Sequence, residues 1–296
     1  RLWFIDQLEG SIQYHVRTVL RFKGKINTEA LTHSLQSIIN RHEILRTVIL
    51  QEEGKPYQHV KRPDEWKLGI TDGSVFNDDP ELLKNYIQQL INTPFDLSKD
   101  YMLRAELITL KEDESVLVVT MHHIASDAWS MPVIVKEVTE LYSSYEADRP
   151  SALAPLELQY ADFSIWQRNY LQGEVLDKKL DYWKKKLDGV SVLHLPSDLI
   201  RTGVKTNSGT TQNFKIEKET ADGLNELSRQ QGSTLFMTLL SAFNVLLYRY
   251  SGQSDISVGT SITNRPQQEI ENLIGFFVNT LALRSEVSND ISFKEF

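Results

Sequence analysis

Residues 116–130 read VLVVTMHHIASDAWS, an apolar run that ends in two histidines and continues into a turn with a carboxylate. The β-branched and large apolar residues at the start of this run predict a buried strand. Because side chains alternate along a strand, His122 and His123 must point to opposite sides. One ring can therefore lie in packed interior while the other faces a cleft.

The turn after this strand places Asp127 where the backbone can fold back on itself. Its carboxylate can accept a bond from a ring nitrogen, or it can tie the turn to a distant cation. Histidine moves protons near neutral pH, because its unperturbed pKa is about 6.5, and a positioned base contributes roughly 10²–10⁴ in rate. On the pattern alone, a structural histidine at a strand end is the commoner interpretation. An iron site with two histidines and one aspartate is disfavoured, because diverging rings cannot easily reach one ion.

Strands and helices alternate on the N-terminal side of this stretch. The pattern over 28–40 is that of an amphipathic helix, which Asn27 or Thr28 can cap. A second helix is expected over 81–91 and must stop before Thr93-Pro94, because the residue before proline avoids helical geometry. The expected strands are 16–22, 44–50, 57–60 and the pair 102–110 and 115–122, which is followed by a helix over 133–145.

Residues 149–155, RPSALAP, form the clearest linker in the chain. Two helical patterns follow it, and then a second alternation begins. Two mixed α/β lobes separated by a proline-marked crossing are the simplest arrangement. The elements expected after the linker are helices over 158–170 and 175–187, a strand over 210–216, helices over 219–230 and 235–250, and strands over 256–261 and 277–283.

Composition excludes several classes of protein. The 296 residues are 41% hydrophobic and 24% charged, which is typical of a soluble globular chain large enough for two lobes. A net charge of −8 argues against nucleic acid as the main partner, and no apolar run approaches the length of a membrane helix. The absence of cysteine excludes disulfides, thiolate zinc sites and a thioester carried on this chain, and it fits a reducing cytoplasm.

Residues 122–130, HHIASDAWS, closely resemble the HHxxxDGWS signature of the condensation domains of nonribosomal peptide synthetases. That family belongs to the wider fold of chloramphenicol acetyltransferase-like acyltransferases. Five matches in the family's order, over nearly the whole chain, identify it as similar to that family. The other four are 1–10 (RLWFIDQLEG), which looks like the tail of the first motif, 41–47 (RHEILRT), 160–168 (YADFSIWQR) and 274–284 (IGFFVNTLALR), which resemble the RHExLRT, YxDxAxWQR and IGxFVNTLALR segments.

The resemblance implies two acetyltransferase-like lobes in a V arrangement, with a tunnel between them and the histidine motif near its middle. We then expect an N-terminal lobe over 1–156, connecting helices over 157–190 and a partial C-terminal lobe over 191–296. The chain opens on Arg1 with neither an initiator methionine nor a signal peptide, and the family's domain continues well beyond Phe296. We expect truncation at both ends, an incomplete second lobe and weak or absent turnover by this piece alone.

The activity implied by the resemblance is amide-bond formation between two carrier-bound groups. An upstream donor carrier domain presents an acyl or peptidyl thioester, and a downstream acceptor carrier domain presents an aminoacyl amine. Both ride on phosphopantetheine supplied by the carriers, so this chain is expected to bind no cofactor and no metal of its own. An adjacent adenylation domain is a further expected partner, and neither nucleic acid nor membrane is expected.

Residue roles follow from the same resemblance. His123 is the expected catalytic residue, either as a base toward the amine or as the group that orients it. His122 is expected to be a structural support, and Asp127 to pair with Arg265. Ala128, Trp129 and Ser130 are expected to line the substrate tunnel. Ala128 departs from the family's usual glycine, and its extra methyl group is expected either to narrow the acceptor channel or to alter amine selection.

Alternatives remain within and outside this activity. An epimerization domain uses a similar double histidine to move an α-proton, although Trp129-Ser130 and the RLWF opening favour condensation. A heterocyclization domain has paired aspartates in place of the histidines. A catalytically silent domain that recruits carriers tends to lose the active histidine, which is intact here, and a free-standing enzyme that uses coenzyme A needs its own start and end. The opening through Gly10 and Tyr14 resembles the subtype that accepts an L-configured donor.

Overall fold

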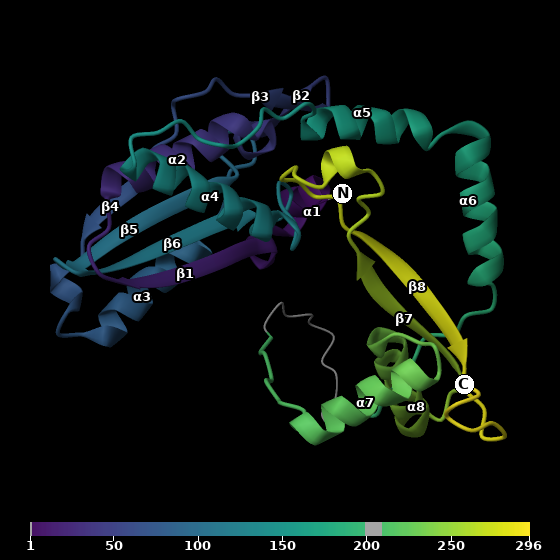
Figure 1. Ribbon diagram of the computed structural model, residues 1–296. Helices are drawn as coiled ribbons and strands as arrows, with labels where there is room; N and C mark the ends of the chain where they lie inside the picture. The colour runs from purple at the N-terminus through teal and green to yellow at the C-terminus, as the bar shows by residue number, and fades with distance from the viewer. Residues whose placement is uncertain (1, 199–208) are drawn as a thin grey trace. The chain divides into compact units, whose positions relative to one another are not determined.

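The computed structural model describes residues 2–198 and 209–296, and it divides into two compact units (Figure 1). Unit 1 comprises Arg1–Leu171 and Thr263–Val278, and unit 2 comprises Gln172–Ile262 and Asn279–Phe296. Each unit combines helices with strands, which confirms the mixed α/β class expected from the sequence. No described helix has both the length and the apolar character needed to cross a membrane.

A four-stranded sheet forms the centre of unit 1, in the order β1-β6-β5-β4. The three long strands pair antiparallel, and β4 runs parallel to β5. The register sets His15 opposite His122 at the end of β6. The strands are β1 (His15–Lys23), β4 (Gly69–Asp72), β5 (Leu103–Lys111) and β6 (Glu114–His122).

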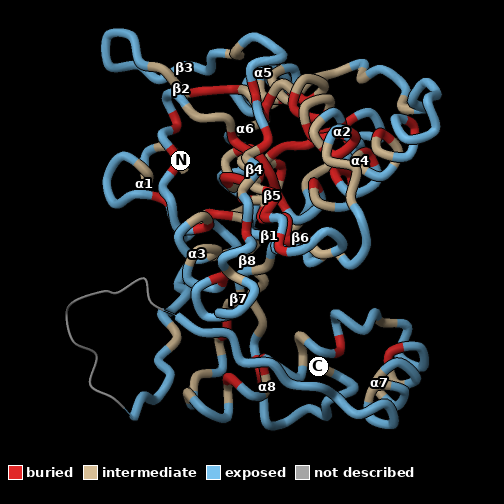
Figure 2. The backbone as a smooth tube through the Cα atoms, turned by 90° about the vertical axis from the view of Figure 1, so that its left-hand side faces the viewer, coloured by how far each residue is buried: buried red, intermediate tan, exposed pale blue. Residues whose placement is uncertain are grey.

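Helices cover both faces of this sheet. Alternate side chains of β6 explain why its sequence is apolar throughout: Leu117 and Met121 pack with the core under α2 and α4, while Val116 and Val118 pack against α3. Figure 2 shows the resulting concentration of buried residues along β5 and β6. The helices of unit 1 are α1 (Leu2–Glu9), α2 (Thr28–Arg41), α3 (Pro80–Asn92), α4 (Ser130–Glu146) and α5 (Tyr160–Tyr170).

The expected strand over 44–50 is wrong in its first half. Glu43–Arg46 form a 3-10 turn, and only then does β2 (Thr47–Glu52) begin, paired with β3 (Lys55–Val60). Ile44 and Leu45 are both buried in the core of unit 1. Neighbours in a strand point to opposite faces, so a turn is what allows two consecutive apolar side chains to enter the same core.

The segment Thr263–Val278 returns to unit 1 from a distant part of the chain. It contains the short turn Gln268–Ile270, and its Leu273 and Phe277 are buried against Phe163 of α5. The start of α5 is itself fixed, because the Asp162 carboxylate accepts a bond from the backbone N–H of Gln159 at 2.8 Å. The segment and α5 therefore form one packed layer beside the end of β6.

Unit 2 has a small core of Leu247, Ile256 and Val287. Helix α8 starts at the side-chain cap of Thr234 and ends at Gly252, whose φ of 69° places it in the left-handed region. The elements of this unit are α6 (Gly173–Lys186), α7 (Lys218–Gln230), α8 (Leu235–Ser251) and the antiparallel pair β7 (Asp255–Ile262) and β8 (Asn279–Glu286).

Two expected strands of the C-terminal part need correction. Residues 210–216 have no regular structure and are exposed, because no described strand lies beside them to complete the hydrogen bonds that a strand requires. The strand expected over 277–283 begins only at Asn279. Phe277 is instead buried in the core beside α5, where the apolar residues of 274–277 belong to the returning segment.

Candidate active site

His122 is the last residue of β6 and is fully buried. The backbone N–H of Ile124 donates to its Nδ1 over 3.0 Å, so the proton of the neutral ring is on Nε2. Nε2–H donates to the Ser11 hydroxyl at 2.8 Å, and that hydroxyl donates to the carboxylate of Asp6. Both ring nitrogens are thus bonded inside the protein, and neither is left for a substrate.

Burial, together with repulsion by His15, lowers the pKa of His122 to about 4. The ring is therefore neutral at physiological pH, in agreement with its bond from Ile124. The unfolded chain binds a proton at His122 near pH 6.5, whereas the folded chain does so only near pH 4. Between these values the unfolded state holds more protons, so the free energy of unfolding falls as the pH falls.

We expect His122 to contribute about 3 kcal/mol to this loss of stability between about pH 6.5 and pH 4. Urea unfolding at pH 7 and pH 5 should show a smaller pH dependence for His122→Gln than for the wild type, because glutamine takes up no proton. His15 also has a lowered pKa, but it is present in both proteins and cancels in the comparison. If the stability of His122→Gln and of the wild type depends on pH to the same extent, His122 is not the source of this loss of stability.

His123 has the opposite arrangement of its ring proton. Its Nδ1 lies 2.6 Å from the carbonyl oxygen of Ser126, and a carbonyl can only accept, so Nδ1 carries the hydrogen. The lone pair is then on Nε2, to which no described residue is bonded. The residue is half-buried, and its ring meets that of Phe276 edge to face, with centroids 5.2 Å apart. One nitrogen is held by the protein and the other is left for chemistry.

Asp127 is buried and organises the turn that follows the histidines. Its Oδ1 accepts from the backbone N–H of Ser130 at 3.0 Å and from the Ser130 hydroxyl at 2.8 Å. Its Oδ2 accepts from the backbone N–H of Phe277 at 3.1 Å. The carboxylate therefore joins the start of α4 to the returning segment.

The ion pair expected between Asp127 and Arg265 is present. Arg265 Nη2 lies 3.3 Å from Asp127 Oδ1, and the two side chains are only 2% and 3% exposed. Nη1 of the same guanidinium donates to the carbonyl oxygens of Ile270 and Leu273, at 2.6 and 2.8 Å. The guanidinium also lies over the Phe277 ring, 3.8 Å from its centroid. Burial lowers the pKa of Arg265, and the charge of Asp127 opposes that shift.

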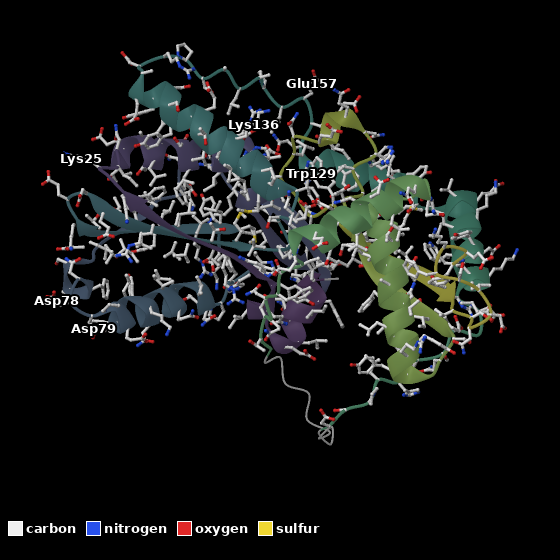
Figure 3. The ribbon with its side chains drawn as sticks, turned by 60° about the horizontal axis from the view of Figure 1, so that its bottom comes forward. Lys25, Asp78, Asp79, Trp129, Lys136 and Glu157 are labelled. Carbon is white, nitrogen blue, oxygen red and sulfur yellow. The ribbon has the colours of Figure 1, made fainter. Side chains whose placement is uncertain are left out.

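The three residues after Asp127 have different surroundings. Ala128 is exposed, and Trp129, labelled in Figure 3 at the start of α4, is 44% exposed and donates from Nε1 to the carbonyl of Glu271 at 3.0 Å. Ser130 is fully buried, and its hydroxyl accepts from the backbone N–H of Gly275 at 3.2 Å. Ala128 and Trp129 are thus accessible at the surface of the turn, whereas Ser130 holds two segments together.

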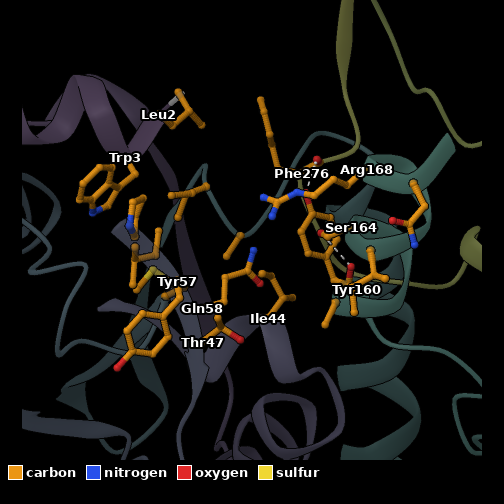
Figure 4. Close-up of a pocket in the computed structure, with 18 residues that line it drawn as sticks. Leu2, Trp3, Ile44, Thr47, Tyr57, Gln58, Tyr160, Ser164, Arg168 and Phe276 are labelled. Atoms are coloured by element: carbon orange, nitrogen blue, oxygen red, sulfur yellow. Dashed lines mark hydrogen bonds between the residues drawn. The ribbon is translucent and has the colours of Figure 1, made fainter. Parts of the chain in front are cut away.

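A cavity of about 650 Å³ lies in unit 1 beside this turn (Figure 4). Its walls come from β2, β3, α5 and the loop after β6, and they include Ile124, Ala125 and Phe276. Phe276 therefore borders the cavity and also contacts the His123 ring. The remaining side chains that define it in Figure 4 include Trp3, Ile44, Tyr57, Tyr160 and Arg168.

Three contributors to the site were not singled out from the sequence: the Ser126 carbonyl, Phe276 and Tyr160. Both aromatic residues fall within segments that match family motifs, so a signal was present. A motif does not say which face of a segment points to the histidine, and a backbone carbonyl has no signature in the sequence. Among residues 2–198 and 209–296, no group of His, Asp or Glu side chains has the arrangement of a metal site.

Comparison with known proteins agrees with the motifs. A family model described as "Condensation domain" matches residues 1–296. A linear gramicidin synthase of Brevibacillus parabrevis is 42% identical over 300 residues, which cover all of this chain and 4% of that protein. The chain thus spans a small part of the length of such relatives.

Solved structures show the same fold. The X-domain from teicoplanin biosynthesis is 28% identical with a TM-score of 0.86, and the match covers 100% of this chain and 66% of that one. The first condensation domain of the calcium-dependent antibiotic synthetase, solved with a substrate analogue, has a TM-score of 0.79 at 20% identity, over 99% of this chain and 70% of that one. The chain belongs to the condensation domain family and is a condensation domain of the nonribosomal peptide synthetase type.

Proposed function

We propose that this chain joins two carrier-bound groups through an amide bond, with His123 as its catalytic residue. The observation that supports this most is the bond from Nδ1 of His123 to the Ser126 carbonyl, 2.6 Å long. It fixes the tautomer in which Nε2 has a lone pair, and that is the form able to accept a proton or a hydrogen bond from an amine.

In the proposed reaction the amine nitrogen of the acceptor attacks the thioester carbonyl of the donor. A C–N bond forms, the C–S bond breaks, and the donor carrier leaves as its thiol. The proton lost by the amine is taken up at Nε2 of His123 and returned to the leaving sulfur, so the ring ends as it began. Even without proton transfer, a hydrogen bond to Nε2 would hold the amine in line with the carbonyl and lower the entropic barrier.

The other site residues have supporting roles in this proposal. His122 fixes the end of β6 as a neutral buried ring, and the pair of Asp127 and Arg265 holds the turn that carries the Ser126 carbonyl. Ala128 and Trp129, which are exposed on that turn, are the residues proposed to border the substrates. Ser130 takes part through the turn, because its side chain is buried.

The chain is proposed to act inside a multidomain synthetase. Its partners would be an upstream donor carrier, a downstream acceptor carrier and an adjacent adenylation domain, and phosphopantetheine would arrive on the carriers. The proposal also includes activity in the cytoplasm and a donor of L configuration. It further includes a division of the chain into an N-terminal lobe that ends at residue 156, connecting helices that end at residue 190, and a C-terminal lobe. The match to multidomain synthetases of which the chain covers 4–8% supports the arrangement in general.

The test uses the domain within its synthetase, with one carrier loaded with an acyl or aminoacyl thioester and the other with an aminoacyl thioester. We expect the intact mass of the acceptor carrier to rise by the donor group while the donor carrier returns to its free thiol. Chiral analysis of the donor separates the alternatives. Epimerised donor without transfer would assign an epimerization domain, and carrier binding without either reaction would assign a silent recruiting domain.

A further inference from the structure

The four residues 274–277 are held unusually firmly for a segment without regular structure. Three of their backbone N–H groups and one carbonyl are bonded to buried or half-buried side chains. These side chains come from the residue that caps the end of α2, from α4 and α5, and from the turn at Asp127. A segment tied at every residue has little freedom to shift. The bonds are Ile274 N–H to His42 Nδ1 (3.4 Å), Gly275 N–H to Ser130 Oγ (3.2 Å), Tyr160 O–H to the carbonyl of Phe276 (2.8 Å) and Phe277 N–H to Asp127 Oδ2 (3.1 Å).

The anchors of this segment are themselves fixed. His42 is 1% exposed, and its Nε2–H donates to the carboxylate of Glu137 at 2.8 Å, which leaves Nδ1 to accept from the segment. Tyr160 packs so closely on Gly275 that a Cβ atom there would lie 2.2 Å from the tyrosine ring. Glycine is therefore required at 275 by close approach. The hydrogen bond from Tyr160 to the Phe276 carbonyl keeps the backbone beside α5.

Phe276 is the side chain that this firmly held backbone presents to His123. Its ring meets the imidazole edge to face, with centroids 5.2 Å apart and an interplanar angle of 89°. Such a contact between aromatic rings is attractive and orientation-dependent. The same phenylalanine borders the cavity shown in Figure 4.

We propose that Phe276 is a positioning residue for His123. The bond from Nδ1 to the Ser126 carbonyl fixes one atom of the imidazole, but it still permits the ring to swing about that atom. The Phe276 ring blocks this swing from one side, so the direction of the Nε2 lone pair is set by a segment that lies more than 140 residues further along the chain. Catalytic groups must be held to a fraction of an ångström, and a second contact on the ring supplies that restraint.

This inference rests on the proposed function of His123, and its test compares variants in the synthetase with both carriers loaded. Phe276→Ala should lower kcat about tenfold and change KM less than about twofold, because the imidazole is misaligned while both substrates still bind. Phe276→Tyr keeps the aromatic ring, so this variant should have the kcat of the wild type. Tyr160→Phe deletes only the hydroxyl that holds the Phe276 carbonyl, and it should lower kcat about threefold with an unchanged KM.

A positioning role is separated from a structural one in the His123→Ala background. There Phe276→Ala should cause no further loss of the residual rate, since a residue that acts through His123 has nothing left to position. The matched control is Tyr182→Ala, which breaks an edge-to-face pair with Trp183, also 5.2 Å between centroids, on α6. This control should leave kcat and KM unchanged.

Either of two outcomes would overturn the inference. One is an unchanged kcat in Phe276→Ala, and the other is an equal fold loss from Phe276→Ala with and without His123. A failure of the proposed function looks different, because His123→Ala would then transfer as fast as the wild type. Loss in His123→Ala together with full kcat in Phe276→Ala would reject the positioning role alone.

Discussion

Replacement of His123 by alanine is expected to lower the rate of amide formation by about 10²–10⁴. Because Nδ1–H is bonded to the Ser126 carbonyl, Nε2 is the ring atom that can take the amine proton or orient the amine. Alanine removes that atom, so both contributions are lost together. The measurement is single-turnover transfer between two loaded carriers, followed by intact mass, at a substrate concentration well above KM.

The matched control is His122→Ala, the neighbouring ring with both nitrogens bonded inside the protein. Its main effect should be a lower unfolding midpoint, with a smaller loss of transfer per folded molecule. Unchanged transfer by His123→Ala would remove His123 from the mechanism.

The regular elements around the site could be predicted because their patterns are local. The apolar run of β6 and the spaced leucines and isoleucines of α2 follow from burial on one or two faces, and both elements are found as expected. The turn Glu43–Arg46 was missed because a short apolar run does not distinguish a strand from a turn packed into the core. Residues 210–216 have a strand-like sequence but no described neighbour to pair with, and pairing is a property of the fold.

The candidate site was predictable to a different degree at each residue. Alternation along β6 placed His122 and His123 on opposite sides, but it did not say which nitrogen of each ring is protonated. That depends on a backbone N–H and a backbone carbonyl in the following turn. The pair of Asp127 and Arg265 joins residues 138 positions apart, so only the family resemblance pointed to it. Phe276 needed the structure, because its role depends on how the returning segment packs.

Asp127→Ala is expected to lower the free energy of unfolding by about 3–5 kcal/mol, the usual loss when one partner of a buried ion pair is removed. The substitution leaves the Arg265 guanidinium 2% exposed with no carboxylate beside it. It also removes the acceptor for the backbone N–H groups of Ser130 and Phe277. Urea unfolding of the wild type and the variant measures the loss, and transfer per folded molecule is measured in parallel.

The same chain has a matched control for burial, because Asp255 and Arg284 form a second carboxylate–guanidinium pair across β7 and β8. Its contacts are shorter, at 2.7 and 2.8 Å, but its side chains are 29% and 25% exposed. Water stabilises a partner left alone there, so Asp255→Ala should lower the free energy of unfolding much less than Asp127→Ala does. If the two substitutions lower the free energy of unfolding by the same amount, burial is not the reason for the structural role of Asp127. If Asp127→Ala unfolds at the same urea concentration as the wild type but fails to transfer the donor group, the aspartate acts in the chemistry instead.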